Sequence, residues 1–229
     1  MDTKYVIPLT QLQEVIDQIR DDYYCLEING KRSFAYQSTY YDTPDLQLYF
    51  NHHKGKLNRF KVRVRRYVDS GLVFFELKAK NNKSRTIKSR VPLSQGEDPF
   101  SNEGVHVLAG IYRLQQLGLK QCIRVDYSRI TLVNKDFTER VTIDTDLKFI
   151  SSNQEVDKSH LVVVEVKQDR AQGSAFTELM KRWHIRKMSL SKYCYGVISL
   201  FPNVKHNNFK PNTIQYNKIA YATASGTGR

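Results

Sequence analysis

Cysteine is scarce in this sequence, and no arrangement of it defines a structural site. Cys25, Cys122 and Cys194 are odd in number, far apart, and form no C-x-x-C pair. This excludes the disulfide framework of small secreted domains and gives no support to a thiolate zinc site. We therefore expect a cytoplasmic protein in a reducing environment.

Long hydrophobic runs and export signals are also missing. No apolar run approaches the roughly 18 residues of a membrane span. The N-terminal stretch MDTKYVIPLTQL lacks the basic and apolar regions of a signal peptide. We expect no transmembrane segment in this chain, and the sequence leaves a membrane-associated partner open.

The sequence contains none of the common nucleophile or nucleotide-binding motifs. There is no G-x-S-x-G, no supported Ser-His-Asp order, and no Walker loop of the form G-x-x-x-x-G-K-[ST]. If the protein binds phosphate, side chains must hold it, unlike in P-loop enzymes.

Acidic residues are few relative to basic ones. There are 36 Lys and Arg against 23 Asp and Glu, which gives a net charge of +13 and a pI near 9.6. Such an excess favours anionic partners, namely nucleic acid, acidic lipid, nucleotides or inorganic polyphosphate. With 229 residues, 40% of them hydrophobic, the chain can bury a substantial core. We expect one domain over residues 1–202 and a flexible tail over 203–229, which is Asn-rich and without periodicity.

The stretch RFKVRVRRYVDSGLVFFELKAK, residues 59–80, predicts a β-hairpin with a charged face. Lys61, Arg63 and Arg65 alternate with apolar residues and therefore share one side of a strand. After the Asp69-Ser70-Gly71 turn, Glu76 and Lys78 alternate in the same way. An ordinary solvated face is one explanation, and a cationic site is the other.

The same alternation recurs along the chain, between segments that predict helices. Ionic residues alternate with apolar ones in SRTIKSRVPL, ERVTIDTDLKF and HLVVVEVKQ. Helices are expected after Thr10, from Thr43-Pro44 to Gly55, from Ser101 to Gly118, over SAFTELMKRWHI and over SLSKYCYGVISLF. These segments together predict an α+β fold.

A closed sheet explains why so many strands carry one charged face. If helices cover the apolar faces on the outside, the charged faces must line an interior. The pattern therefore predicts a β barrel with a polar, cationic lumen and helices packed on its outside. That lumen would bring together Arg63, Arg65, Lys78, Lys88, Arg129 and Arg140. Because unpaired buried charges cost several kcal/mol each, such a lumen makes sense as a water-filled site for phosphates.

The sequence also resembles the VTC domain, the polyphosphate polymerase branch of the triphosphate tunnel metalloenzymes, which are related to the CYTH domains. Nine segments between residues 3 and 200 stand in the expected order: TKYVIP, STYYDTPDLQLY, RFKVRVRRY, FFELKAK, RTIKSR, VDYSRITL, RVTIDTDL, VVVEVK and SLSKYCYG. The CYTH signature E-x-E-x-K is reduced here to Asp2-Thr3-Lys4, which favours the VTC branch.

The resemblance implies a fold, namely an antiparallel β tunnel barrel with a polar, cationic lumen, and it implies phosphate ligands, a metal ligand and a reaction. The implied phosphate ligands are Lys4, Arg63, Arg65, Lys78, Lys88, Arg129, Arg140 and Lys192. Of these, Lys192, Arg63, Arg65 and Lys78 are expected to act in catalysis. Glu165 is the implied carboxylate ligand of Mn²⁺ or Mg²⁺, with an exposed edge strand as the alternative. Glu76 could bind the metal, position a lysine or pair with cations. Lys192 could also belong to a helix cap alone.

The family implies transfer of the terminal phosphoryl group of ATP to a growing polyphosphate chain, with release of ADP. The partners expected are therefore ATP and inorganic polyphosphate, without a stable nucleic-acid partner. Two alternatives stay open at this point. One is a tunnel triphosphatase, in which water replaces the acceptor phosphate. The other is a non-catalytic module that binds polyphosphate or RNA.

Overall fold

The computed structural model describes residues 2–225 except 84, 107, 109–113, 115 and 171–172, with only the backbone of 220–225. One antiparallel sheet dominates it, in the strand order β1-β10-β8-β7-β3-β4-β5-β6, with β2 paired to β7 and β9 paired to β8. The strands are β1 (Asp2–Pro8), β2 (Tyr23–Cys25), β3 (Ser33–Asp42), β4 (Arg59–Tyr67), β5 (Val73–Lys80), β6 (Thr86–Leu93), β7 (Lys120–Asn134), β8 (Glu139–Ile150), β9 (Glu155–Asp157) and β10 (Leu161–Gln168). The predicted α+β class and antiparallel sheet are confirmed.

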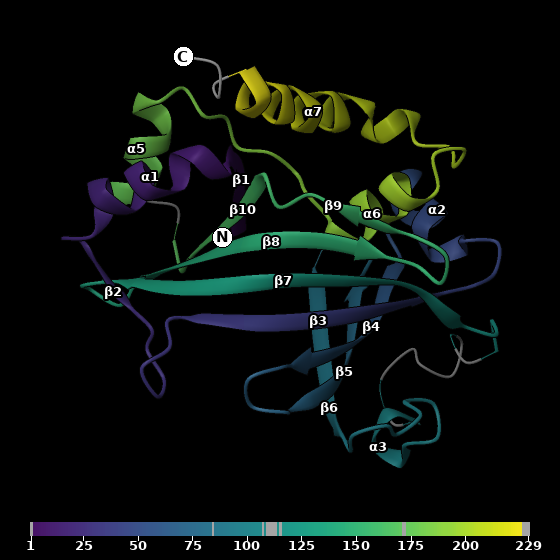
Figure 1. The fold of residues 1–229 in the computed structure, drawn as a ribbon. Helices are drawn as coiled ribbons and strands as arrows, with labels where there is room; N and C mark the ends of the chain where they lie inside the picture. Colours follow the sequence, from purple (N-terminus) through teal and green to yellow (C-terminus); the bar gives the residue numbers. More distant parts are fainter. Residues whose placement is uncertain are drawn as a thin grey trace.

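Helices pack on the sheet from several sides (Figure 1). They are α1 (Leu12–Ile19), α2 (Gln47–His53), α3 (Glu103–His106), α5 (Ala175–Arg182), α6 (Lys192–Leu200) and α7 (Lys210–Ser225), with 3-10 turns η1 (Leu9–Gln11) and η2 (Asn207–Phe209). None of the described helices is long and apolar enough to cross a bilayer.

The apolar faces of the strands lie under helices, as the alternation predicts. Val162, Val164 and Val166 of β10 pack with Val15 of α1 and Phe176 of α5 in one core cluster. In a second cluster, the apolar residues of β4 and β5 pack against α2 and α3; its buried members include Leu48, Val62, Phe75, Leu77 and Val105. Because side chains alternate along a strand, the charged residues between these apolar ones face the other side of the sheet.

The sheet is curved, and its strand path is open in the described residues rather than closed into the expected barrel. β1 and β6 end the strand path, and no ladder joins them in the described residues. Yet the charge of Lys4, on β1, acts on the pKa of both Lys61, on β4, and Lys78, on β5. Strands that lie far apart in the ladder are therefore close across the concave side.

Helix α6 packs against part of that concave side. Tyr193, Tyr195 and Val197 belong to a core cluster with Ile123 of β7 and Phe149 of β8. A Cβ added to Gly196 would lie 2.6 Å from Ile123 and 2.8 Å from Phe149. Glycine at this position therefore lets the helix approach the sheet closely, which sets where Lys192 at its start can reach.

Two helix starts predicted from the sequence are wrong. Thr10 lies within η1, and α1 begins at Leu12 after Gln11, which provides no side-chain cap. The helix expected at Thr43-Pro44 begins at Gln47. The Asp42 carboxylate accepts hydrogen bonds from the amides of Leu48 and Tyr49, both at 2.8 Å, because the chain turns back over it.

Two other predicted helices can be compared with the structure. Ser191 does cap α6, accepting from the amide of Cys194 at 3.3 Å. The helix expected over 101–118 is described only as α3, and its centre lies outside the described residues.

The tail expected to be flexible over residues 203–229 contains η2 and α7. In α7, Tyr216 is buried and its hydroxyl donates to the carbonyl of Ser189 at 3.0 Å. Phe209 and Ile219 pack against the same core cluster. The flexibility of this segment stays a prediction.

Candidate phosphate-binding site

The β4–β5 hairpin has the register that the alternation predicts. Lys61 lies opposite Lys78, and Arg63 lies opposite Glu76. Across the next ladder, Lys78 lies opposite Lys88 and Glu76 opposite Arg90 of β6. The three strands therefore carry two cross-strand rows on one face, which we call the lysine row (Lys61, Lys78, Lys88) and the arginine row (Arg63, Glu76, Arg90).

Glu76 is the anionic partner of the arginines. The Arg63 Nε donates to its carboxylate at 2.6 Å, and Arg65 Nη1 lies 3.7 Å from the other oxygen. Burial alone would raise the pKa of Glu76, but Arg63, Arg65 and Arg90 lower it. Of the roles considered for Glu76, this geometry favours pairing with cations. It holds the two arginine heads in place.

The lysine row carries positive charge with no carboxylate among its own members. Within the described residues, no ion pair involves Lys61, Lys78 or Lys88. Burial, reinforced by Lys61, Lys88 and Lys4, lowers the pKa of Lys78 to about 8. Burial likewise lowers the pKa of Lys61. Neighbouring cations lower one another's pKa because their charges repel. A bound anion would offset this repulsion and stabilise their protonated forms.

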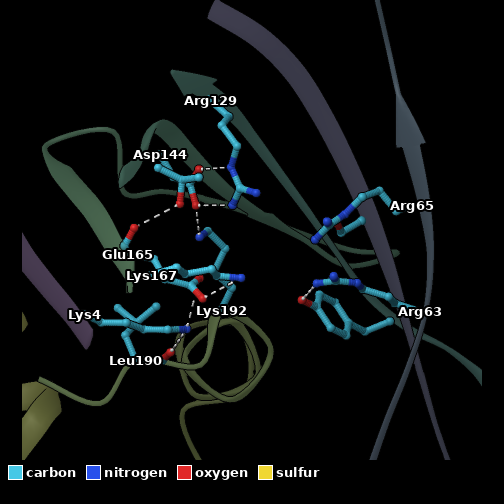
Figure 2. Close-up of polar contacts among 12 residues, drawn as sticks. Lys4, Arg63, Arg65, Arg129, Asp144, Glu165, Lys167, Leu190 and Lys192 are labelled. Atoms are coloured by element: carbon cyan, nitrogen blue, oxygen red, sulfur yellow. Dashed lines mark hydrogen bonds and ion pairs between the residues drawn. The ribbon is translucent and has the colours of Figure 1, made fainter. Parts of the chain in front are cut away.

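On the facing strands, Glu165 of β10 lies between two lysines. Lys167 Nζ is 3.2 Å from one carboxylate oxygen and Lys4 Nζ is 3.7 Å from the other. Lys4 Nζ also donates to the carbonyl of Leu190 at 3.2 Å. Figure 2 shows these side chains gathered near the start of α6. Burial alone would raise the pKa of Glu165, but Lys4 and Lys167 lower it to about 2, so the carboxylate is ionised at neutral pH.

A second buried carboxylate, Asp144 of β8, holds two further cations. Arg129 Nε and Nη2 donate to its two oxygens at 2.6 and 2.8 Å, and Lys192 Nζ donates to one of them. The Arg129 guanidinium and the Lys192 ammonium also lie 5.3 and 4.7 Å from the centre of the Tyr127 ring. Asp144 and Tyr127 thus place one cation from β7 and one from α6 side by side.

These groups surround one volume. The charge of Lys192 acts on both Lys4 and Glu165, while Glu165 in turn acts on Lys78 of the lysine row. Figure 2 shows Arg63 and Arg65 reaching from one side toward Lys192, Lys4 and Asp144 on the other. Cations from β1, β4, β5, β7, β10 and α6 therefore converge on the concave side.

The predicted site residues divide into a buried or half-buried group and an exposed group. The first group contains Lys4, Arg63, Arg65, Glu76, Arg129, Glu165 and Lys192. Arg140 lies opposite Lys167 in the ladder and Lys88 lies opposite Lys78, so these residues are on the correct face. Lys78, Lys88 and Arg140 are exposed and lie at the margin of the site.

The sequence interpretation did not assign four residues that the fold brings here: Lys61, Arg90, Asp144 and Lys167. The alternation could have identified them, because each lies two residues from another charged residue of the same strand face. The alternation does not show which charged residues pair with each other, because paired residues such as Asp144 and Lys192 are 48 residues apart in the sequence.

The carboxylates present fit a divalent cation that is shared with a phosphate ligand. The described residues contain no cluster of three His, Cys, Asp or Glu side chains that could hold an ion alone. Glu165 offers hard oxygen ligands at the edge of the cationic volume, with 20% of its side chain exposed. Mg²⁺ and Mn²⁺ commonly take one or two carboxylates and complete their shell with phosphate oxygens and water. Asp144 is less suited, because both its oxygens are engaged and only 2% of its side chain is exposed.

Comparison with known proteins adds a family and a fold. The model of the VTC domain matches residues 1–201. No curated protein matches the chain. Among solved structures, HpAC1 of Hippeastrum, described as an adenylyl cyclase candidate with a dominant triphosphatase activity, is 10% identical with a TM-score of 0.51, over 90% of this chain and 98% of that one.

Two further structures are more distant. The PH1819 protein of Pyrococcus horikoshii is 15% identical with a TM-score of 0.47, covering 85% of this chain and 93% of its own. An adenylate cyclase candidate from Vibrio parahaemolyticus is 10% identical with a TM-score of 0.46, covering 83% and 94%.

Proposed function

Because the chain belongs to the VTC domain family, we propose that it is a polyphosphate polymerase that transfers the terminal phosphoryl group of ATP to a growing inorganic polyphosphate chain. The observation that carries this proposal is the convergence of cations from six elements on the concave side of the sheet, around Glu165. A linear polyanion such as polyphosphate could engage many of these cations at once.

In the proposed reaction, a terminal oxygen of the acceptor chain attacks the γ-phosphorus of ATP. The new P–O bond extends the chain, the bond to the bridging oxygen of ADP breaks, and ADP leaves with the electron pair. Catalysis of this kind depends on positioning and charge neutralisation, and needs no protein base.

The proposed roles follow the geometry. Lys192, Arg63, Arg65 and Lys78 contact the transferring phosphoryl group, while Lys4, Arg129, Lys88 and Arg140 hold the remaining phosphates. Of the three exposed members, Lys88 and Arg140 are suited to guiding the chain at the margin. Glu165 is the proposed metal ligand, because its contacts with Lys167 and Lys4 are long, at 3.2 and 3.7 Å, whereas Arg63 donates to Glu76 at 2.6 Å.

Glu165 would hold the divalent cation, which would supply neutralisation of the negative charge on the phosphates. The chain's own contribution is to hold Glu165 ionised between Lys4 and Lys167, so that it is ready to accept a cation at neutral pH.

A triphosphatase is the second candidate. HpAC1, which shares the fold, is described with a dominant triphosphatase activity, and the same cations would bind a triphosphate whose γ-phosphorus is attacked by water. The two activities use one site and differ in the acceptor.

Incubation of the purified protein with ATP and Mn²⁺ or Mg²⁺, followed by gel separation of the products, tests the proposal. A ladder of polyphosphate supports the polymerase, and release of free phosphate without a ladder supports the triphosphatase. No turnover with either metal would leave only a binding module. Glu165→Gln is the matched control, since it keeps the size of the side chain and should abolish metal-dependent turnover while the fold survives. Undiminished activity of this variant would remove Glu165 from the metal site.

A further inference from the structure

Tyr40 of β3 lies among the cations of the site but is not explained by the proposed function. Its side chain is buried, with 4% of its surface exposed. The ring stacks on Tyr193 of α6 with centroids 5.1 Å apart, and the Arg63 guanidinium lies 5.8 Å from its centre. With Tyr193 and Arg63 against the ring, Tyr40 has little room to stack on a nucleobase. Any role toward a ligand must come from its hydroxyl.

The Tyr40 oxygen accepts a hydrogen bond. Arg63 Nη1 donates to it at 3.0 Å. A guanidinium has donors only, so the Tyr40 proton must point to another acceptor. The other charged groups that act on Tyr40 are Arg65 and Lys61 of β4, and Tyr40 in turn acts on Lys4 of β1. All four of these groups are cations, and none can accept.

Four other buried tyrosines of the protein do have an acceptor. The hydroxyl of Tyr49 donates to the carbonyl of Lys205 at 3.1 Å, and that of Tyr216 to the carbonyl of Ser189 at 3.0 Å. Tyr23 and Tyr193 donate to the carboxylates of Glu139 and Asp42. The hydroxyl of Tyr40 has no such acceptor among the described residues, and a buried donor without an acceptor costs stability unless a ligand or water supplies one.

We propose that the Tyr40 hydroxyl is a phosphate ligand of this site, which accepts from Arg63 and donates its proton to a phosphate oxygen of the bound chain. This rests on the proposed phosphate binding but not on whether the site polymerises or hydrolyses. Tyr40 would therefore add a directional, uncharged donor to a site otherwise built from cations.

The electrostatics of the free protein agree with this assignment. Burial alone would raise the pKa of Tyr40, but Arg63, Arg65 and Lys61 outweigh it and lower the pKa. A phosphate placed among the same cations would cancel this effect and raise the pKa again. Ligand binding at alkaline pH should therefore return a proton to Tyr40.

The first experiment measures affinity without turnover. Tripolyphosphate is titrated by calorimetry at pH 7 in the presence of EDTA, into wild type, Tyr40→Phe and Tyr49→Phe. Tyr40→Phe should bind about tenfold more weakly, as expected for loss of one hydrogen bond to a charged group. Tyr49→Phe is the matched control. It also loses a buried hydroxyl but lies away from the cations, and should bind like wild type.

The second experiment follows the proton directly. At alkaline pH, tripolyphosphate should decrease the ultraviolet absorbance of phenolate in wild type and in Tyr49→Phe, and should leave Tyr40→Phe unchanged. If wild type and Tyr40→Phe bind tripolyphosphate with equal affinity, or show the same absorbance change, Tyr40 is not a phosphate ligand. The proposed function is unaffected by that result. If wild type itself binds no tripolyphosphate, both this inference and the proposed function fail.

Discussion

Asp144→Asn tests whether one buried carboxylate organises the site. The substitution keeps the size of the side chain but removes the charge that Arg129 and Lys192 share. The amide oxygen of asparagine can replace only one of the two accepting oxygens, and its NH2 group donates where a carboxylate oxygen accepted from Arg129 or Lys192. The change therefore removes hydrogen bonds as well as the charge. Two cations then lie close together with no anion between them.

The magnitude follows from the pKa of Asp144. Burial alone would raise this pKa, but Lys192 and Arg129 lower it from 3.8 to about 2. That difference corresponds to roughly 2 kcal/mol of folding free energy at neutral pH. Since breaking a buried ion pair leaves uncompensated charge, we expect the free energy of unfolding to fall by about 2–4 kcal/mol.

The pH dependence has a definite sign. A carboxylate with a lowered pKa stabilises the fold above its unfolded value of 3.8, and this contribution is lost as the pH falls toward about 2. The stability difference between wild type and Asp144→Asn should therefore be complete at neutral pH and shrink below about pH 4.

Urea denaturation monitored by circular dichroism measures this difference. Glu155→Gln is the control, because the exposed pair of Glu155 with Lys148, at 3.0 Å, should contribute nothing measurable. The reasoning is refuted if Asp144→Asn unfolds at the wild-type urea concentration at pH 7, or if its deficit is the same in acid.

Three further predictions concern the phosphate ligands and the C-terminal helix. Because Lys78 has a pKa lowered to about 8, the affinity for tripolyphosphate should fall as the pH rises through 8. In Lys78→Arg the side chain stays charged, so the affinity measured by calorimetry should no longer fall around pH 8. If the affinity of this variant falls as in wild type, Lys78 is not the group that titrates. Lys192→Ala should slow turnover of ATP at least tenfold, about 1.4 kcal/mol of transition-state stabilisation. It should also lower the midpoint of unfolding, because Asp144 loses a partner; a wild-type initial rate would assign Lys192 to the cap alone. Tyr216→Ala should destabilise the fold by about 3 kcal/mol, since the ring is buried against Tyr195 at a centroid distance of 4.7 Å. If urea denaturation gives the same free energy of unfolding for Tyr216→Ala and wild type, the packing of α7 does not stabilise the fold.

The alternation of side chains along the strands was sufficient to predict the sheet and its charged face. Lys61, Arg63 and Arg65 had to share a side, because every second residue of a strand points the same way. The Asp69-Ser70-Gly71 turn fixed the register that places Arg63 opposite Glu76, and Gly71 has the positive φ of 70° that such a turn favours. These features are local, so they can be read from neighbouring residues.

The partners of each charge were decided only by the tertiary structure. Sequence alternation cannot show that Asp144 joins Arg129 to Lys192, or that Glu165 lies between Lys4 and Lys167, because these contacts depend on how far the sheet curves and where α6 docks. The start of α2 was missed for the same reason. Its cap is the carboxylate of Asp42, which reaches the helix only after the chain has turned back. Pairing energies inside a protein depend on distance and burial, and both are properties of the assembled fold rather than of any segment.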